Sequence, residues 1–110
     1  MGSARYNFPV CKARGEPFIY FNSAASKYIT SPHLEVRETT DMVFFVPSNI
    51  SADPKVIAKH TGGCEVVVRV LYEKRTVREG DVFKLYRLRN GTLAIKKREY
   101  LARKETRHDA

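Results

Sequence analysis

The stretch LYRLRNGTLAIKKR, residues 85–98, constrains the fold more than any other part of the chain. Its Asn90-Gly91 pair is the strongest short sequence signal for a β-hairpin, because both central residues of a type I′ turn need a positive φ. A two-residue loop predicts a register with Arg87 opposite Ala94, and a slip by one residue would bury an arginine. The apolar face in this register consists of Tyr86, Leu88, Leu93 and Ile95. The opposite face consists of Phe83, Leu85, Arg87, Arg89, Thr92, Ala94, Lys96 and Arg98.

The basic residues are concentrated in the C-terminal part of the chain. The chain has 20 Lys and Arg against 12 Asp and Glu, and residues 69–110 contain 13 basic and 6 acidic residues. This asymmetry favours a polyanionic partner, most often nucleic acid, over a role in solubility alone. Because a two-stranded β-ribbon fits the DNA major groove, we expect the C-terminal hairpin and tail to bind DNA in preference to RNA. The candidate residues are Arg87, Arg89, Lys96, Lys97, Arg98, Arg103, Lys104 and Arg107.

Upstream of this hairpin, short strand patterns alternate with turn and helix signals. Residues 1–17 contain Pro9, Gly15 and Pro17 and are expected to form an extended lead-in with at most a short strand. The remaining predicted elements are a strand at 18–22, a short helix at 23–29 capped by Asn22 or Ser23, a hairpin at 34–47 whose second strand is the more buried, a helix at 51–63 capped by Asp53, a strand at 64–72 and a charged connection at 73–81.

The order of these elements predicts an α+β, sheet-dominated fold. Two β-hairpin units, within 18–47 and 64–98, echo each other loosely as an internal repeat. Two short helices are expected to pack on a mostly antiparallel sheet, with the 64–72 strand lying centrally. We expect a single globular domain at 18–101, followed by a basic polar tail at 102–110.

The segment TVREGDVFKLYRLRNGTLAIKK, residues 76–97, resembles the C-terminal part of the AbrB-like (swapped-hairpin) transcription factors. In that part of the family, a hydrophobic residue and a short linker precede Gly-Asp, and two strands joined by a tight turn follow. The resemblance implies DNA binding and regulation of transcription, and it makes Arg69 and Arg75 candidate contacts because they flank the matching strand and turn. The matching residues are Val77, Gly80, Asp81, Val82, Leu85, Gly91 and Ile95.

No set of residues in the sequence predicts an enzyme or a metal site. His60 and Cys64 have a spacing compatible with metal binding, but a structural zinc needs four ligands, usually presented as close pairs, and only one pair exists here. Cys64 is expected to follow a helix, where nothing lowers the pKa of its thiol. The sequence contains no Walker-type phosphate loop and no dinucleotide fingerprint. We therefore expect no catalysis and no cofactor.

The sequence also bears on location. No apolar run approaches the roughly 18–20 residues needed to span a bilayer, and the N-terminus has no signal-peptide pattern. We expect a cytoplasmic protein, monomeric or homodimeric, with no membrane partner. Cys11 and Cys64 are expected to stay reduced there, although the sequence leaves a single disulfide open.

Two functions are consistent with these features. The first is a small basic nucleic-acid-binding protein, which the family resemblance makes a regulator of transcription. The alternative is a protein-binding inhibitor encoded by a phage or mobile element, which would dock on a nucleic-acid-handling enzyme as some anti-CRISPR proteins do. The alternative depends only on the small size of the chain and its lack of motifs.

Overall fold

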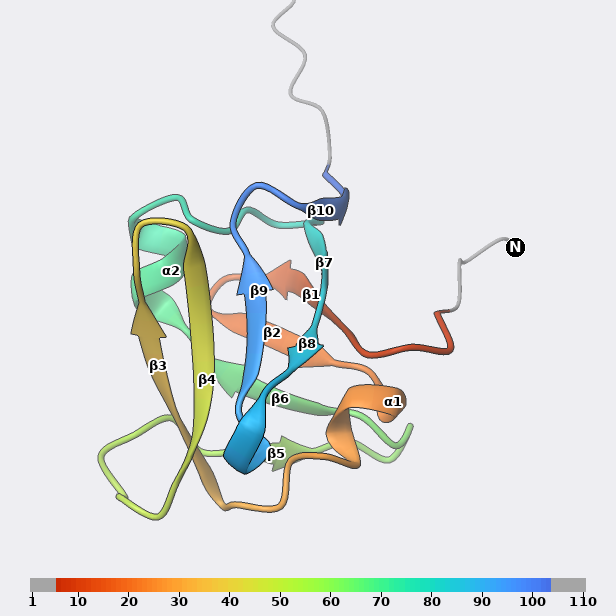
Figure 1. Ribbon diagram of the computed structural model, residues 1–110, viewed down its shortest axis with the longest axis vertical. Helices are drawn as coiled ribbons and strands as arrows, with labels where there is room; N and C mark the ends of the chain where they lie inside the picture. The colour runs from red at the N-terminus through yellow and green to blue at the C-terminus, as the bar shows by residue number, and fades with distance from the viewer. Residues whose placement is uncertain (1–5, 104–110) are drawn as a thin grey trace, which may run out of the picture.

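The computed structural model describes residues 6–103, which form two antiparallel β-sheets with two short helices at their margins (Figure 1). The large sheet has the strand order β10-β7-β1-β2-β6-β5, and the small sheet has the order β3-β4-β9-β8. The expected α+β, sheet-dominated fold is confirmed, with two sheets in place of one. The large-sheet strands are β1 (Val10–Gly15), β2 (Phe18–Phe21), β5 (Ile57–Ala58), β6 (Cys64–Val67), β7 (Val82–Lys84) and β10 (Tyr100–Ala102). The small-sheet strands are β3 (His33–Glu38), β4 (Met42–Ser48), β8 (Tyr86–Arg87) and β9 (Leu93–Lys96).

The hydrophobic core lies between the two sheets. Alternate residues of a strand point to opposite faces, and the inward residues of β1 and β2 are fully buried. The rings of Phe21 in β2 and Phe45 in β4 meet edge to face, with centroids 5.2 Å apart, and so join one sheet to the other. The two thiols, Cys11 and Cys64, are buried in this core and are free.

The N-terminal lead-in is one place where the expectation was wrong. Residues 10–15 form β1, which lies between β2 and β7 in the interior of the large sheet. The domain therefore begins before residue 18. The prolines and the glycine that suggested a lead-in sit at the ends of the strand, and the cis Glu16-Pro17 peptide occupies the turn to β2.

The first helix and the first long hairpin agree with the sequence. Helix α1 (Ser23–Ser26) is capped by Asn22, whose side chain accepts a hydrogen bond from the Ala25 N–H. Strands β3 and β4 pair along their whole length, and β4 buries more of its residues than β3. The predicted cap and the predicted hairpin are confirmed, and the helix is shorter than the expected 23–29, since it ends at Ser26.

The helix predicted at 51–63 is absent. The Asp53 carboxylate, expected to cap it, accepts a hydrogen bond from the Ser48 hydroxyl, while the Asp53 N–H donates to Ile50 in a turn. The chain then forms β5, which pairs with β6, and the Lys59 N–H donates to the Gly63 carbonyl to close the hairpin. The Asp53 carboxylate thus bonds to Ser48 instead of capping a helix, and the β-branched residues Val56 and Ile57 are extended.

The strand predicted at 64–72 is shorter than expected, and a second helix follows it. Strand β6 ends at Val67, which pairs with the first residue of β2, Phe18. The next residue, Val68, donates its N–H to the Pro17 carbonyl in the turn before β2, and the chain then turns into α2 (Arg69–Glu73). The Tyr72 hydroxyl then donates to the Phe18 carbonyl at 2.6 Å, which holds α2 against the end of β2.

The C-terminal hairpin has a different register from the predicted one. Its loop, the 3₁₀ turn η1 (Arg89–Gly91), has three residues, so Tyr86 pairs with Ala94 and Arg87 with Leu93. Asn90 and Gly91 do adopt the positive φ that the sequence indicated, but the Leu88 N–H donates to the Thr92 carbonyl and draws Arg89 into the loop.

This register also changes which side chains are buried. Phe83 and Leu85 enter the core, whereas Leu88 is 40% exposed. Leu85 lies at the bend where the chain leaves the large sheet after β7 and joins the small sheet as β8. The predicted hairpin continued straight through this position, so it placed Phe83 and Leu85 on the outer face.

A buried ion pair joins the C-terminal strand to the turn before β7. Asp81 is fully buried, and its carboxylate accepts two hydrogen bonds from the Arg103 guanidinium, at 2.9 and 2.8 Å, and one from the Arg78 N–H. The hydrogen bonds to Asp81 raise the pKa of Arg103. Arg103, expected at a binding surface, therefore has a structural role.

Replacing Asp81 with asparagine should lower the free energy of unfolding by about 3–5 kcal/mol, because it leaves the Arg103 charge partly buried without its partner. A urea titration measures this loss. The matched control is Asp41→Asn, since Asp41 is exposed, and its effect should stay within about 0.5 kcal/mol. Equal effects of the two substitutions would contradict the structural role of the pair.

Candidate functional site

The basic residues of the C-terminal hairpin do not share one face. Arg87 lies opposite Leu93 and Lys96 lies opposite Met42, so the two side chains leave opposite faces of the small sheet. The Arg87 guanidinium covers the Tyr28 ring at 4.4 Å, and the Lys96 ammonium lies 4.7 Å from the Tyr86 ring. Arg89 is in the η1 loop and Arg98 is in the turn after β9, both exposed. The shared basic face expected from the two-residue loop is therefore not formed.

Lys97 is engaged in an ion pair. Its ammonium lies 2.6 Å from the Glu38 carboxylate, which also accepts hydrogen bonds from Thr76 at 2.8 Å and Lys74 at 3.4 Å. Burial alone would raise the pKa of Glu38, but the hydrogen bonds from Lys97 and Thr76 outweigh it and lower that pKa below its ordinary value. This cluster ties the end of β3 to the segments that follow α2 and β9.

The remaining predicted residues are separated from the hairpin. Arg69 begins α2, and Arg75 follows it with a φ of 61°. Through Lys74 and Glu38 this region contacts β3, at the opposite edge of the small sheet from β8. Lys104 and Arg107 lie outside the described residues.

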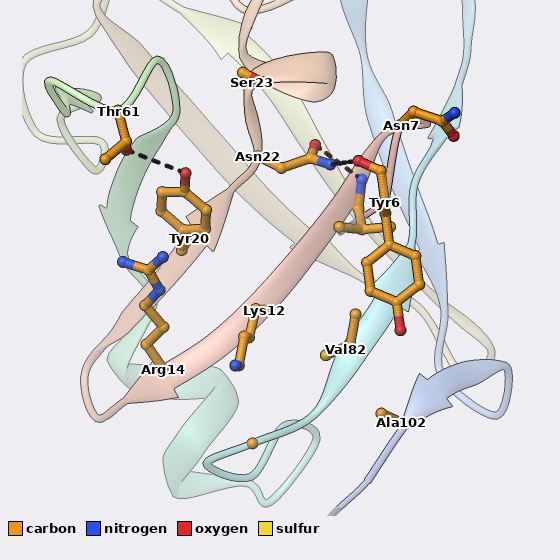
Figure 2. Close-up of a pocket in the computed structure, with 12 residues that line it drawn as sticks. Tyr6, Asn7, Lys12, Arg14, Tyr20, Asn22, Ser23, Thr61, Val82 and Ala102 are labelled. Carbon is orange, nitrogen blue, oxygen red and sulfur yellow. Dashed lines mark hydrogen bonds between the residues drawn. The ribbon is translucent and has the colours of Figure 1, made fainter. Parts of the chain in front are cut away.

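A hollow lies on the outer face of the large sheet, and we call it the large-sheet groove (Figure 2). Its volume is about 990 Å³, at the upper end of the usual range for ligand pockets. Strands β1, β2 and β7 form its floor, where Tyr20, Lys12 and Val82 are direct cross-strand neighbours. One wall is the N-terminal segment with Tyr6, and another is the β5–β6 loop with Thr61.

The floor is positively charged because of the alternation in β1. Cys11 and Ala13 point into the core, so Lys12 and Arg14 point outward into the groove. Neither cation forms an ion pair with another residue in the range 6–103, and no Asp or Glu of that range lines the groove. The groove therefore presents uncompensated positive charge.

Tyr20 is held in a defined position at one side of the floor. The Arg14 guanidinium lies 3.7 Å from the centroid of its ring, and its hydroxyl is 3.4 Å from the Thr61 hydroxyl (Figure 2). Gly63 is buried beneath it, where a Cβ atom would clash with the Tyr20 hydroxyl and the Phe21 carbonyl oxygen. The arginine and the tyrosine thus form a flat stack on the floor.

Asn22 positions the N-terminal wall. Its amide nitrogen donates to the carbonyls of Tyr6 and Phe8, at 3.3 and 2.9 Å, while its oxygen accepts from the N–H groups of Val10 and Ala25. The Tyr6 ring packs edge to face on Phe8, with centroids 5.4 Å apart. In the view of Figure 2, Lys12 lies between Tyr6 on one side and the Arg14–Tyr20 stack on the other.

No arrangement typical of catalysis or metal binding accompanies the groove. Among residues 6–103, no three His, Cys, Asp or Glu side chains converge as metal ligands would. Ser48, Asp53 and His33 lie close together, but the serine hydroxyl donates to the aspartate and the imidazole Nδ1 contacts the Asp53 backbone carbonyl. A nucleophilic serine would instead bond to the imidazole.

None of the helices in residues 6–103 has the length and apolar character required to cross a membrane.

Sequence reasoning missed the groove because it treated residues 1–17 as a lead-in. The signal was present in VCKARG, where small apolar and cationic residues alternate with the period of a half-buried strand. In FIYF the same alternation places Tyr20 on the outer face beside Lys12. The pairing of these two strands could not be read from the sequence, because Glu16-Pro17 between them lacks the Asn-Gly or Asp-Gly signal of a tight hairpin turn.

Substituting Gly63 with alanine should destabilise the protein by about 1–3 kcal/mol, because the added methyl overlaps the Tyr20 ring and the β2 backbone. The control is Gly15→Ala, where an added Cβ meets nothing within 4 Å. Thermal unfolding of both variants provides the comparison. A Gly63→Ala variant as stable as Gly15→Ala would show that Tyr20 is not held in this way.

Replacing Glu38 with glutamine should cost about 1.5–3 kcal/mol at neutral pH, because hydrogen bonds from charged donors are lost. A lowered folded-state pKa stabilises the fold above the unfolded-state pKa of about 4.3, and the contribution disappears as the pH falls through the folded value. The difference between the native and variant free energies of unfolding should therefore shrink below about pH 4. Glu35→Gln, at a more exposed ion pair, is the control and should show little effect at any pH.

Comparison of the chain with protein-family models, curated proteins and solved structures finds no match. Function is therefore inferred from the chemistry of the described side chains. Among the described residues, Tyr6, Lys12, Arg14 and Tyr20 are brought together in one hollow, whereas the exposed Arg89 and Arg98 lie outside it.

Proposed function

We propose that this protein binds nucleic acid through the large-sheet groove. The observation that carries the proposal is the combination of two uncompensated cations, Lys12 and Arg14, with two tyrosines in one hollow that no described carboxylate lines. Cationic ligands are disfavoured there by repulsion, whereas an anionic ligand gains from both cations. Aromatic rings and arginine planes are the groups on which nucleic-acid bases stack.

The net charge of the chain supports the same conclusion. Ala102 lines the groove, and Lys104 and Arg107 follow it closely in the sequence. The whole chain has 20 Lys and Arg against 12 Asp and Glu, an excess that favours a polyanionic partner, whereas residues 104–110 are balanced, with Lys104 and Arg107 against Glu105 and Asp109.

The segment that resembles AbrB-like transcription factors also contributes to the groove. Gly80 and Val82, both within residues 76–97, are lining residues. DNA binding and regulation of transcription are therefore the activities that we propose for the groove. Two buried free thiols are compatible with the reducing cytoplasm, where we place the protein.

The test is fluorescence anisotropy of labelled oligonucleotides against salt concentration. Lys12→Ala/Arg14→Ala should weaken binding at least about tenfold and reduce the salt slope by about 1–2, because each lost phosphate contact contributes about 0.7–0.9 to that slope. Arg87→Ala/Arg89→Ala is the matched control, since it removes the same charge from the C-terminal hairpin, and it should change affinity less than threefold.

Three outcomes would contradict this proposal. A loss confined to the hairpin variant would move the interface to Arg87 and Arg89. Absence of binding at 50 mM salt would exclude nucleic acid as the ligand. A protein partner captured after nuclease treatment, and released by the groove variant, would instead support the inhibitor alternative.

A further inference from the structure

We infer that the large-sheet groove accepts a single strand, with one base on the Arg14–Tyr20 stack, a second on Tyr6 and the linking phosphate on Lys12. This inference rests on the proposed function and specifies its substrate class. It begins from the shape of the site. The groove holds the flat groups of Tyr6, Arg14 and Tyr20, on which only an unstacked base can lie, whereas a duplex keeps its bases stacked inside.

The first base position is the Arg14–Tyr20 stack. A separation of 3.7 Å between guanidinium and ring is that of two flat groups in contact, so one face of the guanidinium is already covered by Tyr20. The packing of Tyr20 on Gly63 and its contact with Thr61 hold the pair in place without a ligand. A preformed arginine plane of this kind stacks on any base, because every base has a π-face.

The second base position is Tyr6. Asn22 holds the backbone of the wall through the Tyr6 and Phe8 carbonyls, and the edge contact with Phe8 occupies the rim of the tyrosine ring. Figure 2 shows the ring of Tyr6 extending along the groove beside Val82, on the far side of Lys12 from Tyr20. Two stacking groups on opposite sides of one cation match the order base, phosphate, base of a dinucleotide.

The polar rim of the groove suits a strand of varied sequence. Asn7, Ser23 and Thr61 line it and carry amide or hydroxyl groups that can both donate and accept hydrogen bonds. Such groups can bond to the edge of any base, so stacking and charge set the affinity. We therefore expect little dependence on base sequence.

The decisive probe is an abasic single strand, which has the phosphates of a DNA oligonucleotide but none of its bases. Native protein should bind a thymine oligonucleotide more tightly than either the abasic strand or the matching duplex. Tyr20→Leu and Tyr6→Leu should each weaken thymine-strand binding about 5- to 150-fold, as expected for loss of one stacked base. Neither substitution should change binding to the abasic strand.

Conservative and remote variants complete the design. Tyr20→Phe and Tyr6→Phe keep the rings and should restore most of the affinity. Tyr86→Leu removes a tyrosine that contacts Glu99 on the small sheet and should leave affinity unchanged, with thermal unfolding used to confirm that each variant folds.

The outcomes separate this inference from the proposed function. Equal or tighter binding to duplex, together with unchanged affinity of Tyr20→Leu and Tyr6→Leu, would overturn the single-strand assignment. Salt-dependent binding that is lost in Lys12→Ala/Arg14→Ala would still support nucleic-acid binding in that case.

Discussion

The inward-facing side chains of the first hairpin determine the architecture on which the other features depend. Cys11, Ala13, Ile19 and Phe21 are fully buried, and Phe21 meets Phe45 of the opposing sheet. Because side chains alternate along a strand, this burial forces Lys12, Arg14 and Tyr20 onto the outer face. The cationic floor of the groove is thus a direct consequence of core packing, because burying one face of β1 exposes Lys12 and Arg14 on the other.

The net charge of the chain overstates the charge that is free to act on a partner. Arg103 and Lys97 both come from the basic C-terminal part, and both are committed to buried or partly buried carboxylates, Asp81 and Glu38. These pairs fasten the last strands to the rest of the fold. Lys12 and Arg14 come from the nearly neutral N-terminal part, yet they have no such partner within residues 6–103.

Local patterns in the sequence predicted local structure well and longer-range pairing poorly. The hairpin at 33–48 and the Asn22 cap followed from alternation and from side-chain chemistry that acts within a few residues. The hairpin register failed because the position of Leu85 depends on both sheets, and the helix at 51–63 failed because Ser48 engages its predicted cap. The groove depends on β1 pairing with β7, about seventy residues away, which no local pattern encodes.

The buried thiol of Cys11 has a consequence for measuring motion in this protein. Cys11 lies in β1 directly between Val10 and Lys12, on the core side of the strand that forms the groove floor, and burial raises the pKa of its thiol. Solvent does not reach Cys11 in the folded protein, and the thiolate is the reactive form of a thiol. A thiol reagent can therefore react with Cys11 only when β1 separates from its neighbours. The rate at which Cys11 is labelled, measured separately from that of the second buried thiol, Cys64, therefore reports the opening of the groove floor with no introduced probe.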